Sequence, residues 1–429
     1  MNYEETLEWM FNQIPMYQRT GKAAYKVDLD KTHQIDEYFG KPHIAFKTIH
    51  IAGTNGKGSV SNILASVLQA AGYKTGLYTS PHLKDFRERI RVNGEMVEKD
   101  FVVDFIEKHK DFFLEVGPSF FEMSVAMAFQ YFKEEEVDIA VVEVGMGGRL
   151  DSTNIITPEV TAITNIGMDH TQFLGDTLEE IAHEKGGTIK SDVPVVIGET
   201  HPATQPIFRK MAKDKGADIQ FADHHLKLQN RKFTDDISYQ YDVYKRNQIF
   251  LGNLQTDLLG SYQEKNIATA LQVIEILIHK GYQISEISIR YGIQNVRKTT
   301  GFHGRWMVLE RNPWIVCDTA HNREGLEYIM TQLNEMKVSQ IHFVLGFVND
   351  KNLDNVLDLF SKKANYYFTK ADIPRALNEQ KLAREAEKYG LRGKTWPTVA
   401  EALEAAKRNA GKDDLIYIGG STFVVSEVL

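Results

Sequence analysis

A glycine-rich stretch near the start of the chain constrains the fold more than any other feature. It runs from His50 to Ser59 and reads His-Ile-Ala-Gly-Thr-Asn-Gly-Lys-Gly-Ser. The apolar run at 46–52 predicts a buried strand before it, and apolar residues at helical spacing from Val60 to Ala71 predict a helix after it. A strand, a glycine-rich turn and a helix in this order form a cradle in which backbone N–H groups face a phosphate.

The spacing of this stretch departs from the general P-loop pattern. Gly53 lies three residues before Gly56 rather than five, and Gly58 separates Lys57 from Ser59. A plain glycine-rich turn between a strand and a helix is the alternative. Because the flanking strand and helix both match, we favour the phosphate cradle. In it Lys57 reaches the outer phosphates and the Ser59 hydroxyl is a ligand for Mg²⁺.

Length and composition limit the classes of protein that need to be considered. A chain of 429 residues is long for one core, and we predict two domains, 1–296 and 297–429. The net charge of −8 argues against a nucleic-acid partner. The single cysteine, Cys317, excludes a disulfide within the chain and fits a reducing compartment. No run reaches the ~18 apolar residues of a membrane span, and we see no signal peptide. We therefore expect a cytoplasmic protein without a membrane partner. We also expect it to be a monomer.

A second strand places a carboxylate where it is unusual. The continuous apolar run at 137–144 is typical of a parallel sheet that is covered on both faces, yet Glu143 lies near its end. A lone buried carboxylate is costly, so Glu143 needs a partner. A nearby Arg or Lys is one alternative. We favour Mg²⁺ beside the phosphate cradle, because P-loop enzymes hold this ion with an acidic residue on a neighbouring strand.

Three further sites give weaker signals. His170 follows the predicted strand at 160–165 and can point toward the same sheet edge, although a lone His there is more often structural. Lys185 follows the predicted helix at 178–183 and by itself resembles a surface lysine. The segment 80–91 contains Ser, His and several Arg, and is equally well explained as a lid over the cradle or as a solvated basic loop.

The second half of the chain predicts another α/β domain. A strand at 194–197, a polar region with short strand-like pieces and a helix at 266–280 precede a predicted linker at 292–304. Strands and helices then alternate, which indicates a smaller, doubly wound domain. The predicted strands are 314–318, 341–346, 366–369 and 415–418, and the first helices are 326–336 and 353–360. Asp318 and His321 follow the first of these strands, at a ligand-binding edge. Two such edges favour an active site in a cleft between the domains.

Taken together, these motifs resemble those of the folylpolyglutamate synthase and dihydrofolate synthase family, which is of the ATP-dependent Mur-ligase type. The matching stretches are His50 to Ser59, Thr79 to Leu83, Arg87 to Ile90, Glu143 to Asn154 and Asp318 to Asn322. The resemblance extends over nearly the whole chain. It implies an N-terminal P-loop ATPase domain with a mainly parallel sheet, a smaller C-terminal α/β domain, and an amide ligase activity.

The resemblance also implies the site residues. The nucleotide-binding set is Gly53, Thr54, Asn55, Gly56, Lys57, Gly58, Ser59, Asn266, Arg305, Asp318 and His321. The metal ligands are Ser59, Ser80, Glu143, His170 and Lys185, and the catalytic set is Lys57, Glu143, His170 and Lys185. Lys185 matches a lysine that is often carbamylated in this family, where the added carboxylate helps to hold a second metal. Mild departures are Thr319 for Gly, Gly186 for Ala, and Tyr262-Gln263 for His-Gln.

The implied chemistry begins with a carboxylate, which is a poor electrophile until ATP converts it to an acyl phosphate. The amine of L-glutamate then attacks, and phosphate leaves. The expected substrates are ATP, L-glutamate and dihydropteroate or a folate, with Mg²⁺, and we expect both folate reactions. We expect the N-terminal segment and residues 80–91 to line the pterin pocket. The alternatives are a Mur-type ligase of cell-wall precursors and a P-loop ATPase or binding module that does not ligate. The Ser-Pro-His-Leu and 143–154 motifs favour the folate branch, and the second α/β domain argues against a simple switch.

Overall fold

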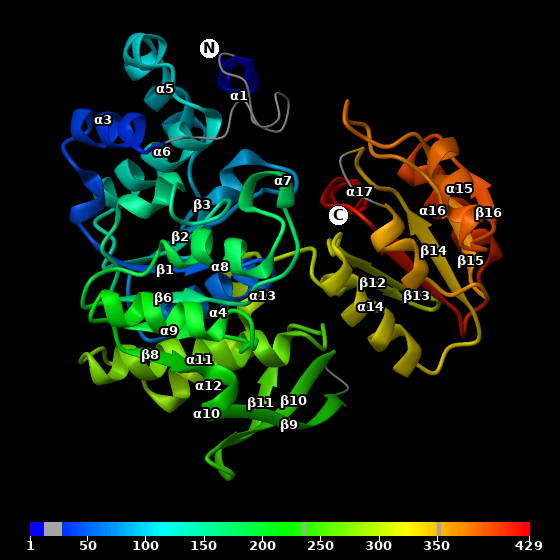
Figure 1. Cartoon of the computed structure of the whole chain (residues 1–429). Helices are drawn as coiled ribbons and strands as arrows, with labels where there is room; N and C mark the ends of the chain where they lie inside the picture. Colours follow the sequence, from blue (N-terminus) through cyan, green and yellow to red (C-terminus); the bar gives the residue numbers. More distant parts are fainter. Residues whose placement is uncertain (13–27, 235–236, 350–352) are drawn as a thin grey trace. The chain divides into compact units, whose positions relative to one another are not determined.

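The computed structural model of the chain describes residues 1–12, 28–234, 237–349 and 353–429 (Figure 1). They form two compact units. The first contains residues 1–257 and 263–302, and the second contains residues 258–262 and 303–429. The chain therefore crosses from the first unit to the second and back before it finally leaves the first unit after Phe302. Both units have a mixed α/β fold with mostly parallel strands, as the sequence predicted.

The first unit is built on an eight-stranded sheet with the order β4-β3-β2-β5-β1-β6-β7-β8. All neighbouring strands from β2 to β8 are parallel, whereas β3 and β4 are added antiparallel at one edge. The strands are β1 (Lys47–Ala52), β2 (Thr75–Tyr78), β3 (Ile90–Val92), β4 (Glu95–Met96), β5 (Ile139–Glu143), β6 (Val160–Ile163), β7 (Val195–Ile197) and β8 (Ile219–Phe221).

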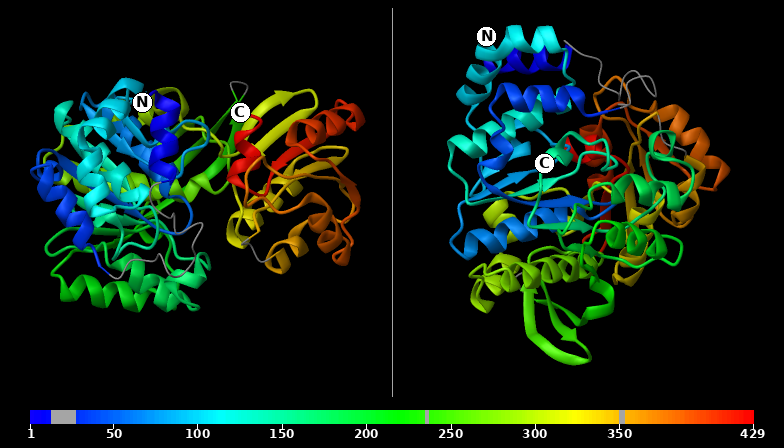
Figure 2. Two further views of the ribbon diagram at one scale, coloured as in Figure 1. Left: turned by 90° about the horizontal axis from the view of Figure 1, so that it is seen from above. Right: turned by 60° about the vertical axis from the view of Figure 1, so that its left-hand side comes forward.

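Helices cover both faces of this sheet (Figures 1 and 2). On one face α6 packs on Ala140 and Val142 of β5, while α8 and α9 pack on β6 and β7. On the other face α4 lies against β1, β2 and β5, and α11 lies against β6 and β7. A sheet covered twice explains why these strands are apolar along their whole length. The helices are α1 (Tyr3–Asn12), α3 (Asp30–Tyr38), α4 (Lys57–Ala70), α5 (Lys99–Val116), α6 (Phe120–Glu134), α7 (Thr171–Leu174), α8 (Leu178–Gly186), α9 (Gln205–Asp214), α10 (Ala222–His225), α11 (Gln263–His279), α12 (Glu286–Gln294) and α13 (Val296–Thr300).

The polar region of the first unit folds as a separate antiparallel sheet of three strands, with the order β11-β10-β9. Its strands are β9 (Leu226–Thr234), β10 (Ser238–Lys245) and β11 (Gln248–Thr256). The sequence indicated only short strand-like pieces here, because one face of the sheet is exposed and its polar residues hide the pattern. The predicted linker at 292–304 contains the end of α12 and the whole of α13, and α13 packs on α4 within the first unit.

The second unit has a six-stranded sheet with the order β12-β13-β17-β14-β15-β16. Its strands are β12 (Met307–Arg311), β13 (Trp314–Asp318), β14 (Ile341–Leu345), β15 (Asn365–Phe368), β16 (Gly393–Thr395) and β17 (Leu415–Gly419), and only β12 is antiparallel to its neighbour. Its helices are α14 (Arg323–Glu335), α15 (Glu379–Lys388), α16 (Val399–Asn409) and α17 (Thr422–Ser426).

The predicted helix at 353–360 is wrong. That segment forms two short 3-10 turns, Leu353–Asn355 and Leu357–Leu359, and the apolar residues Leu357 and Phe360 are buried. Phe360 packs edge-on against Phe343 of β14. The apolar residues of this segment therefore pack against the sheet without forming a continuous helix. Within the described part of the chain, no helix has the length and apolar character needed to cross a membrane.

Candidate active site

The glycine-rich stretch forms the turn between β1 and α4, where its glycines are sterically required. Gly53 and Gly56 have φ angles of +141° and +86°, which L side chains rarely adopt. A Cβ atom on Gly53 would lie 1.9 Å from the Thr164 Oγ1 atom, and one on Gly56 would lie 2.3 Å from the Asn266 Oδ1 atom. The turn is therefore packed so tightly between β6 and α11 that only glycine fits at these two positions.

The residues that follow β6 hold the turn in place. The backbone N–H of Thr54 donates to the Asn165 carbonyl oxygen at 3.0 Å, and the N–H of Asn55 donates to Asn165 Oδ1 at 2.9 Å. The Thr164 hydroxyl donates to the Asn55 carbonyl oxygen at 2.5 Å. These bonds fix the turn before any ligand arrives, and a preformed turn lowers the cost of ordering a phosphate site.

Two lysines meet at one carbonyl group of this turn. Lys57 Nζ donates to the Gly53 and Thr54 carbonyl oxygens at 3.0 and 3.1 Å, and Lys185 Nζ donates to the same Gly53 oxygen at 2.8 Å. Lys185 lies in the last turn of α8 and its residue is only 4% exposed, so its interpretation as a surface lysine was wrong. Burial lowers the pKa of Lys185 to about 7, helped by the Lys57 charge and opposed by Asp169 and Asp151.

The loop after β5 holds the α8 turn that contains Lys185. The Arg149 N–H donates to the Glu184 carbonyl oxygen at 2.8 Å, and the Asn154 side chain donates to the Arg149 and Gly187 carbonyl oxygens, both at 3.1 Å. A Cβ atom on Gly148 would lie 2.8 Å from the Glu184 carbonyl oxygen. The Gly-Met-Gly-Gly-Arg segment is thus in close backbone contact with the Lys185 turn.

Glu143 ends β5 beside the first turn of α4. It is 4% exposed, and a Cβ atom on Gly58 would lie 3.6 Å from its Oε2 atom. The carboxylate therefore lies close to the N-terminal turn of a helix that also contains Ser59. The Ser59 hydroxyl accepts a hydrogen bond from Gln263 Nε2 at 3.2 Å, and Asn266 Nδ2 donates to Gln263 Oε1 at 2.8 Å. In this way α11 brings Asn266 to the phosphate turn.

Ser80 and His170 lie on two other loops of the first unit. Ser80 is half-buried after β2 and precedes Pro81 through a cis peptide bond. His170 is exposed, has a φ angle of +51°, and precedes α7. Its backbone N–H donates to Asp169 Oδ1 at 2.9 Å.

Internal hydrogen bonds order the segment 80–91. The Glu88 carboxylate accepts the backbone N–H groups of Leu83, Lys84 and Asp85 at 2.7 to 2.9 Å. Arg89, only 7% exposed, donates to His82 Nδ1 at 2.8 Å. The buried Arg89 does not fit a fully solvated basic loop, although Lys84 in the same segment is exposed, and the role of the segment as a lid stays a prediction.

In the second unit, Asp318 ends β13 and is almost completely buried. Its Oδ2 atom accepts hydrogen bonds from the Tyr262 hydroxyl at 2.5 Å and the Trp306 N–H at 2.6 Å, and Oδ1 accepts the Ala320 N–H at 2.7 Å. Burial raises the pKa of Asp318, while the Arg305 charge and these hydrogen bonds oppose the shift. His321 lies just beyond, with its Nδ1 atom 3.0 Å from the Thr319 carbonyl oxygen.

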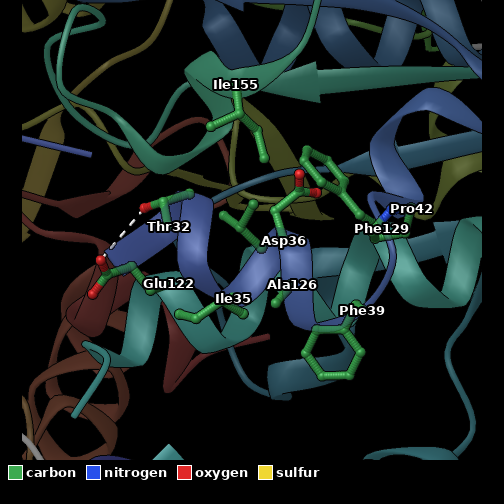
Figure 3. A pocket seen from close by; sticks show the side chains of 10 residues that line it. Thr32, Ile35, Asp36, Phe39, Pro42, Glu122, Ala126, Phe129 and Ile155 are labelled. Carbon is green, nitrogen blue, oxygen red and sulfur yellow. Dashed lines mark hydrogen bonds between the residues drawn. The ribbon is translucent and has the colours of Figure 1, made fainter. Parts of the chain in front are cut away.

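A narrow pocket between α3 and α6 is a poor candidate for a ligand site (Figure 3). Most of its lining is apolar, and its polar groups already have partners in the protein. Thr32 Oγ1 donates to Glu122 Oε1 at 3.4 Å, and Asp36 pairs with His43 at 2.7 Å. Glu122 also caps the start of α6. We therefore interpret this pocket as imperfect helix packing and place the candidate site at the phosphate turn.

Two family models match the chain. The model of the Mur ligase middle domain matches residues 51–274, and the model of the Mur ligase glutamate ligase domain matches residues 304–422. The dihydrofolate synthase/folylpolyglutamate synthase of Bacillus subtilis is 31% identical over 440 residues, which cover 99% of this chain and 98% of that protein. The chain belongs to the folylpolyglutamate synthase and dihydrofolate synthase family of Mur ligases. Membership of this family makes it an ATP-dependent, ADP-forming ligase.

Other similar proteins agree with this family. A probable bifunctional folylpolyglutamate synthase/dihydropteroate synthase of Haloferax volcanii is 31% identical over 100% of this chain, which spans 50% of that protein. The structure of Escherichia coli FolC in complex with DHPP and ADP has a TM-score of 0.84 and 28% identity, covering 100% of this chain and 97% of that one. A bifunctional folylpolyglutamate synthase/dihydrofolate synthase structure with Mn, AMPPNP and L-glutamate bound has a TM-score of 0.81 and 27% identity over the same shares of the two chains.

Sequence reasoning missed several residues that shape the site of this folylpolyglutamate synthase family member. Asn165 and Thr164 fix the phosphate turn, and Gln263 joins Ser59 to Asn266. The sequence contained no signal for Asn165, because a polar residue after a strand is common. Gln263 stands out only as part of the Tyr-Gln pair, in which Tyr262 is the residue that differs from the expected His-Gln, so the sequence contained no sign of its bond to Ser59.

Proposed function

We propose that the chain adds L-glutamate to dihydropteroate and to folates through an acyl-phosphate intermediate. The observation that best supports this reaction is the convergence of Lys57 and Lys185 on the Gly53 carbonyl group, with the buried Glu143 carboxylate close to Gly58 at the start of the following helix. Relatives of the family with ADP, DHPP or L-glutamate in their structures support the same substrates. We further propose that small molecules are the only partners and that the enzyme is a cytoplasmic monomer.

In the proposed reaction, the phosphate turn binds the ATP phosphates through its backbone N–H groups and the start of α4. Lys57 carries positive charge to the outer phosphates, where charge stabilisation is the main help that a protein gives to phosphoryl transfer. Asn266 contacts the nucleotide from α11, and Arg305, Asp318 and His321 contact it from the second unit. A carboxylate oxygen of the folate substrate attacks the γ-phosphate and ADP leaves. The glutamate amine then attacks the acyl carbon and releases phosphate.

The residues present fit Mg²⁺. Within the described ranges, no three or more His, Cys, Asp or Glu side chains converge on a common metal position. Mg²⁺ keeps several waters and is bound by one or two carboxylates together with substrate phosphates, and the buried Glu143 carboxylate close to Gly58 is the group of this chain that matches this requirement. We propose that Ser59, Ser80, Glu143 and His170 hold it, with a carbamate on Lys185 as a further oxygen ligand. The bound ion would neutralise charge on the phosphates.

The structure supports carbamylation of Lys185 on two grounds. First, its amine is buried beside Lys57 and shares the Gly53 carbonyl group, so a charged ammonium there is disfavoured. Second, only the neutral amine reacts with CO₂, and burial brings the pKa of this lysine to about 7. In the reaction the amine nitrogen bonds to the carbon of CO₂ and loses a proton, which leaves a carboxylate. That anion would replace a buried cation with a ligand for the metal.

The decisive experiment measures ADP release by the purified chain with ATP, Mg²⁺ and L-glutamate. Separate reactions contain dihydropteroate, tetrahydrofolate or a UDP-linked muramyl precursor, and product mass identifies the amide that forms. We expect glutamate-dependent ADP release with the first two acceptors and none with the third. Turnover with the muramyl precursor alone would assign the chain to the cell-wall branch. ADP release that is independent of every acceptor would indicate an ATPase that does not ligate.

A further inference from the structure

The two residues Tyr262 and Gln263 lie at the point where the chain passes from the second unit back to the first. Segment 258–262 is part of the second unit, and Gln263 begins α11 of the first. Each side chain bonds within its own unit. The Tyr262 hydroxyl donates to Asp318 Oδ2 at 2.5 Å, and Gln263 Nε2 donates to Ser59 Oγ at 3.2 Å. One peptide bond therefore separates a contact with Asp318 from a contact with the phosphate turn.

Both Tyr262 and Gln263 are held by several close contacts. On the Tyr262 side, the Gln332 side chain of α14 donates to the Leu259 carbonyl oxygen at 2.8 Å and accepts the Ser261 N–H at 2.6 Å. A Cβ atom on Gly260 would lie 2.4 Å from the tyrosine ring, so the segment fits closely around that side chain. These contacts attach the short segment 258–262 to the second unit and fix the direction of the Tyr262 hydroxyl.

On the other side, Gln263 is completely buried and uses both ends of its amide. Its Nε2 atom donates to Ser59, and its Oε1 atom accepts from Asn266 Nδ2 at 2.8 Å. Asn266 in turn lies against Gly56 of the phosphate turn, where its Oδ1 atom would be 2.3 Å from an added Cβ. A shift of Gln263 would therefore disturb the phosphate turn at two places.

We propose that Tyr262 and Gln263 are positioning residues that couple Asp318 to the phosphate turn during nucleotide binding. This inference rests on the nucleotide roles proposed above for Ser59 and Asp318. Neither Tyr262 nor Gln263 needs to touch the nucleotide. Tyr262 holds the Asp318 carboxylate, Gln263 holds Ser59 and Asn266, and the peptide bond between them transmits a displacement of one contact to the other.

The test is a double-mutant cycle on nucleotide affinity, since non-additive effects are the signature of energetic coupling. Titration calorimetry with ADP and with a non-hydrolysable ATP analogue, both with Mg²⁺, gives the Kd of wild type, Tyr262→Phe, Gln263→Glu and the double variant. Tyr262→Phe removes only the hydroxyl, and Gln263→Glu keeps the shape but loses the amide donor. We expect each single variant to raise Kd about tenfold and the double variant to raise it about tenfold as well, rather than about a hundredfold.

Tyr417 offers a matched control. Its hydroxyl is buried and lies 3.5 Å from the backbone carbonyl oxygen of Asp318, so Tyr417→Phe removes a similar group without touching the carboxylate. We expect its Kd to equal that of wild type. Thermal unfolding of every variant separates the two kinds of role, because a purely structural role lowers Tm and leaves Kd unchanged.

Additive effects in the double variant, or an unchanged Kd in Tyr262→Phe, would overturn the proposal. If Tyr262→Phe does not fold, a cycle of Gln263→Glu with Asp318→Asn asks the same question, and additivity there would also overturn it. The proposed function fails separately, because a chain that binds nucleotide but transfers no glutamate still reports the coupling in these titrations.

Discussion

Replacing Lys185 by alanine is expected to abolish most of the ligation, and a small carboxylate is expected to restore part of it. The magnitude follows from the buried position of the lysine amine beside Lys57. At pH 7 an ordinary lysine with a pKa of 10.5 is about 0.03% neutral, whereas a pKa of about 7 makes it about half neutral. CO₂ therefore meets about a thousandfold more reactive amine at this site than at an exposed lysine. Loss of the resulting metal ligand should reduce kcat roughly 30- to 1,000-fold, or about 2–4 kcal/mol.

The assay follows ADP release with and without acetate and bicarbonate. Acetate should raise the activity of Lys185→Ala but not that of wild type. A ¹³C NMR signal of the carbamate should appear when wild type is given labelled bicarbonate, and it should be absent in Lys185→Ala. Lys190→Ala is the matched control, because burial also lowers the pKa of Lys190, whose partly buried side chain donates to the Asn154 carbonyl oxygen instead of the phosphate turn.

The same reasoning predicts a pH dependence. Because a proton on Lys185 prevents carbamate formation, wild-type activity should fall as the pH decreases from 8 to 6, and Lys185→Ala rescued by acetate should lack that decrease. Wild-type activity in Lys185→Ala without any added carboxylate would refute the reasoning. An identical acid limb in the rescued variant would show that another group titrates.

Four further results are expected. Lys57→Ala should retain the fold and lose about 2–4 kcal/mol of transition-state stabilisation at saturating ATP. A near-normal kcat in this variant would contradict the role of Lys57 at the ATP phosphates. Glu143→Gln should weaken the Mg²⁺ dependence of activity along with the rate, whereas an unchanged Mg²⁺ titration would make Glu143 structural. Gly148→Ala should inactivate the enzyme, because its Cβ would lie 2.8 Å from the Glu184 carbonyl oxygen, while Gly411→Ala, with 3.5 Å to its nearest neighbour, should not. Without bicarbonate, Lys185→Met should raise the free energy of unfolding by a few kcal/mol, and Tm with it, at pH 7 or below but not near pH 10.5. The reason is that burial lowers the pKa of Lys185 in the folded chain, so the unfolded chain binds more protons between about pH 7 and 10.5. A Tm gain that is independent of pH would contradict this assignment of the pKa.

Sequence reasoning placed the parts of the site that depend on local chain geometry. The strand, turn and helix around Gly53 to Ser59 follow from apolar spacing and from the backbone freedom of glycine. Glu143 at the end of a continuous apolar strand was correctly predicted to be buried, and the structure adds that its carboxylate lies beside the first turn of α4. The alternation of strands and helices after residue 305 was enough to predict the smaller α/β domain. These features are readable because each depends on residues that are near one another in the chain.

Tertiary structure alone decided the environment of Lys185. Its sequence context, at the end of an amphipathic helix, is that of a surface residue, yet the 145–154 loop packs over it and the phosphate turn supplies its acceptor. The 145–154 loop and the phosphate turn are both far from Lys185 in the sequence, and no local sequence pattern predicts that they pack against it. Burial then changes the chemistry of the amine, because the cost of a desolvated charge depends on everything packed around it.

The contacts of Tyr262 and Gln263 were likewise decided by the tertiary structure alone. From the sequence the two residues are a mild departure from a family motif, and nothing in their spacing shows that one side chain bonds within the second unit and the other within the first. Their partners, Asp318 and Ser59, were both predicted as nucleotide-binding residues, but each was predicted alone. Sequence patterns determine which residue types stand at strand ends and turns. Only the folded chain decides which of them share a hydrogen bond, because those contacts join segments that are brought together by the packing of the sheets and helices.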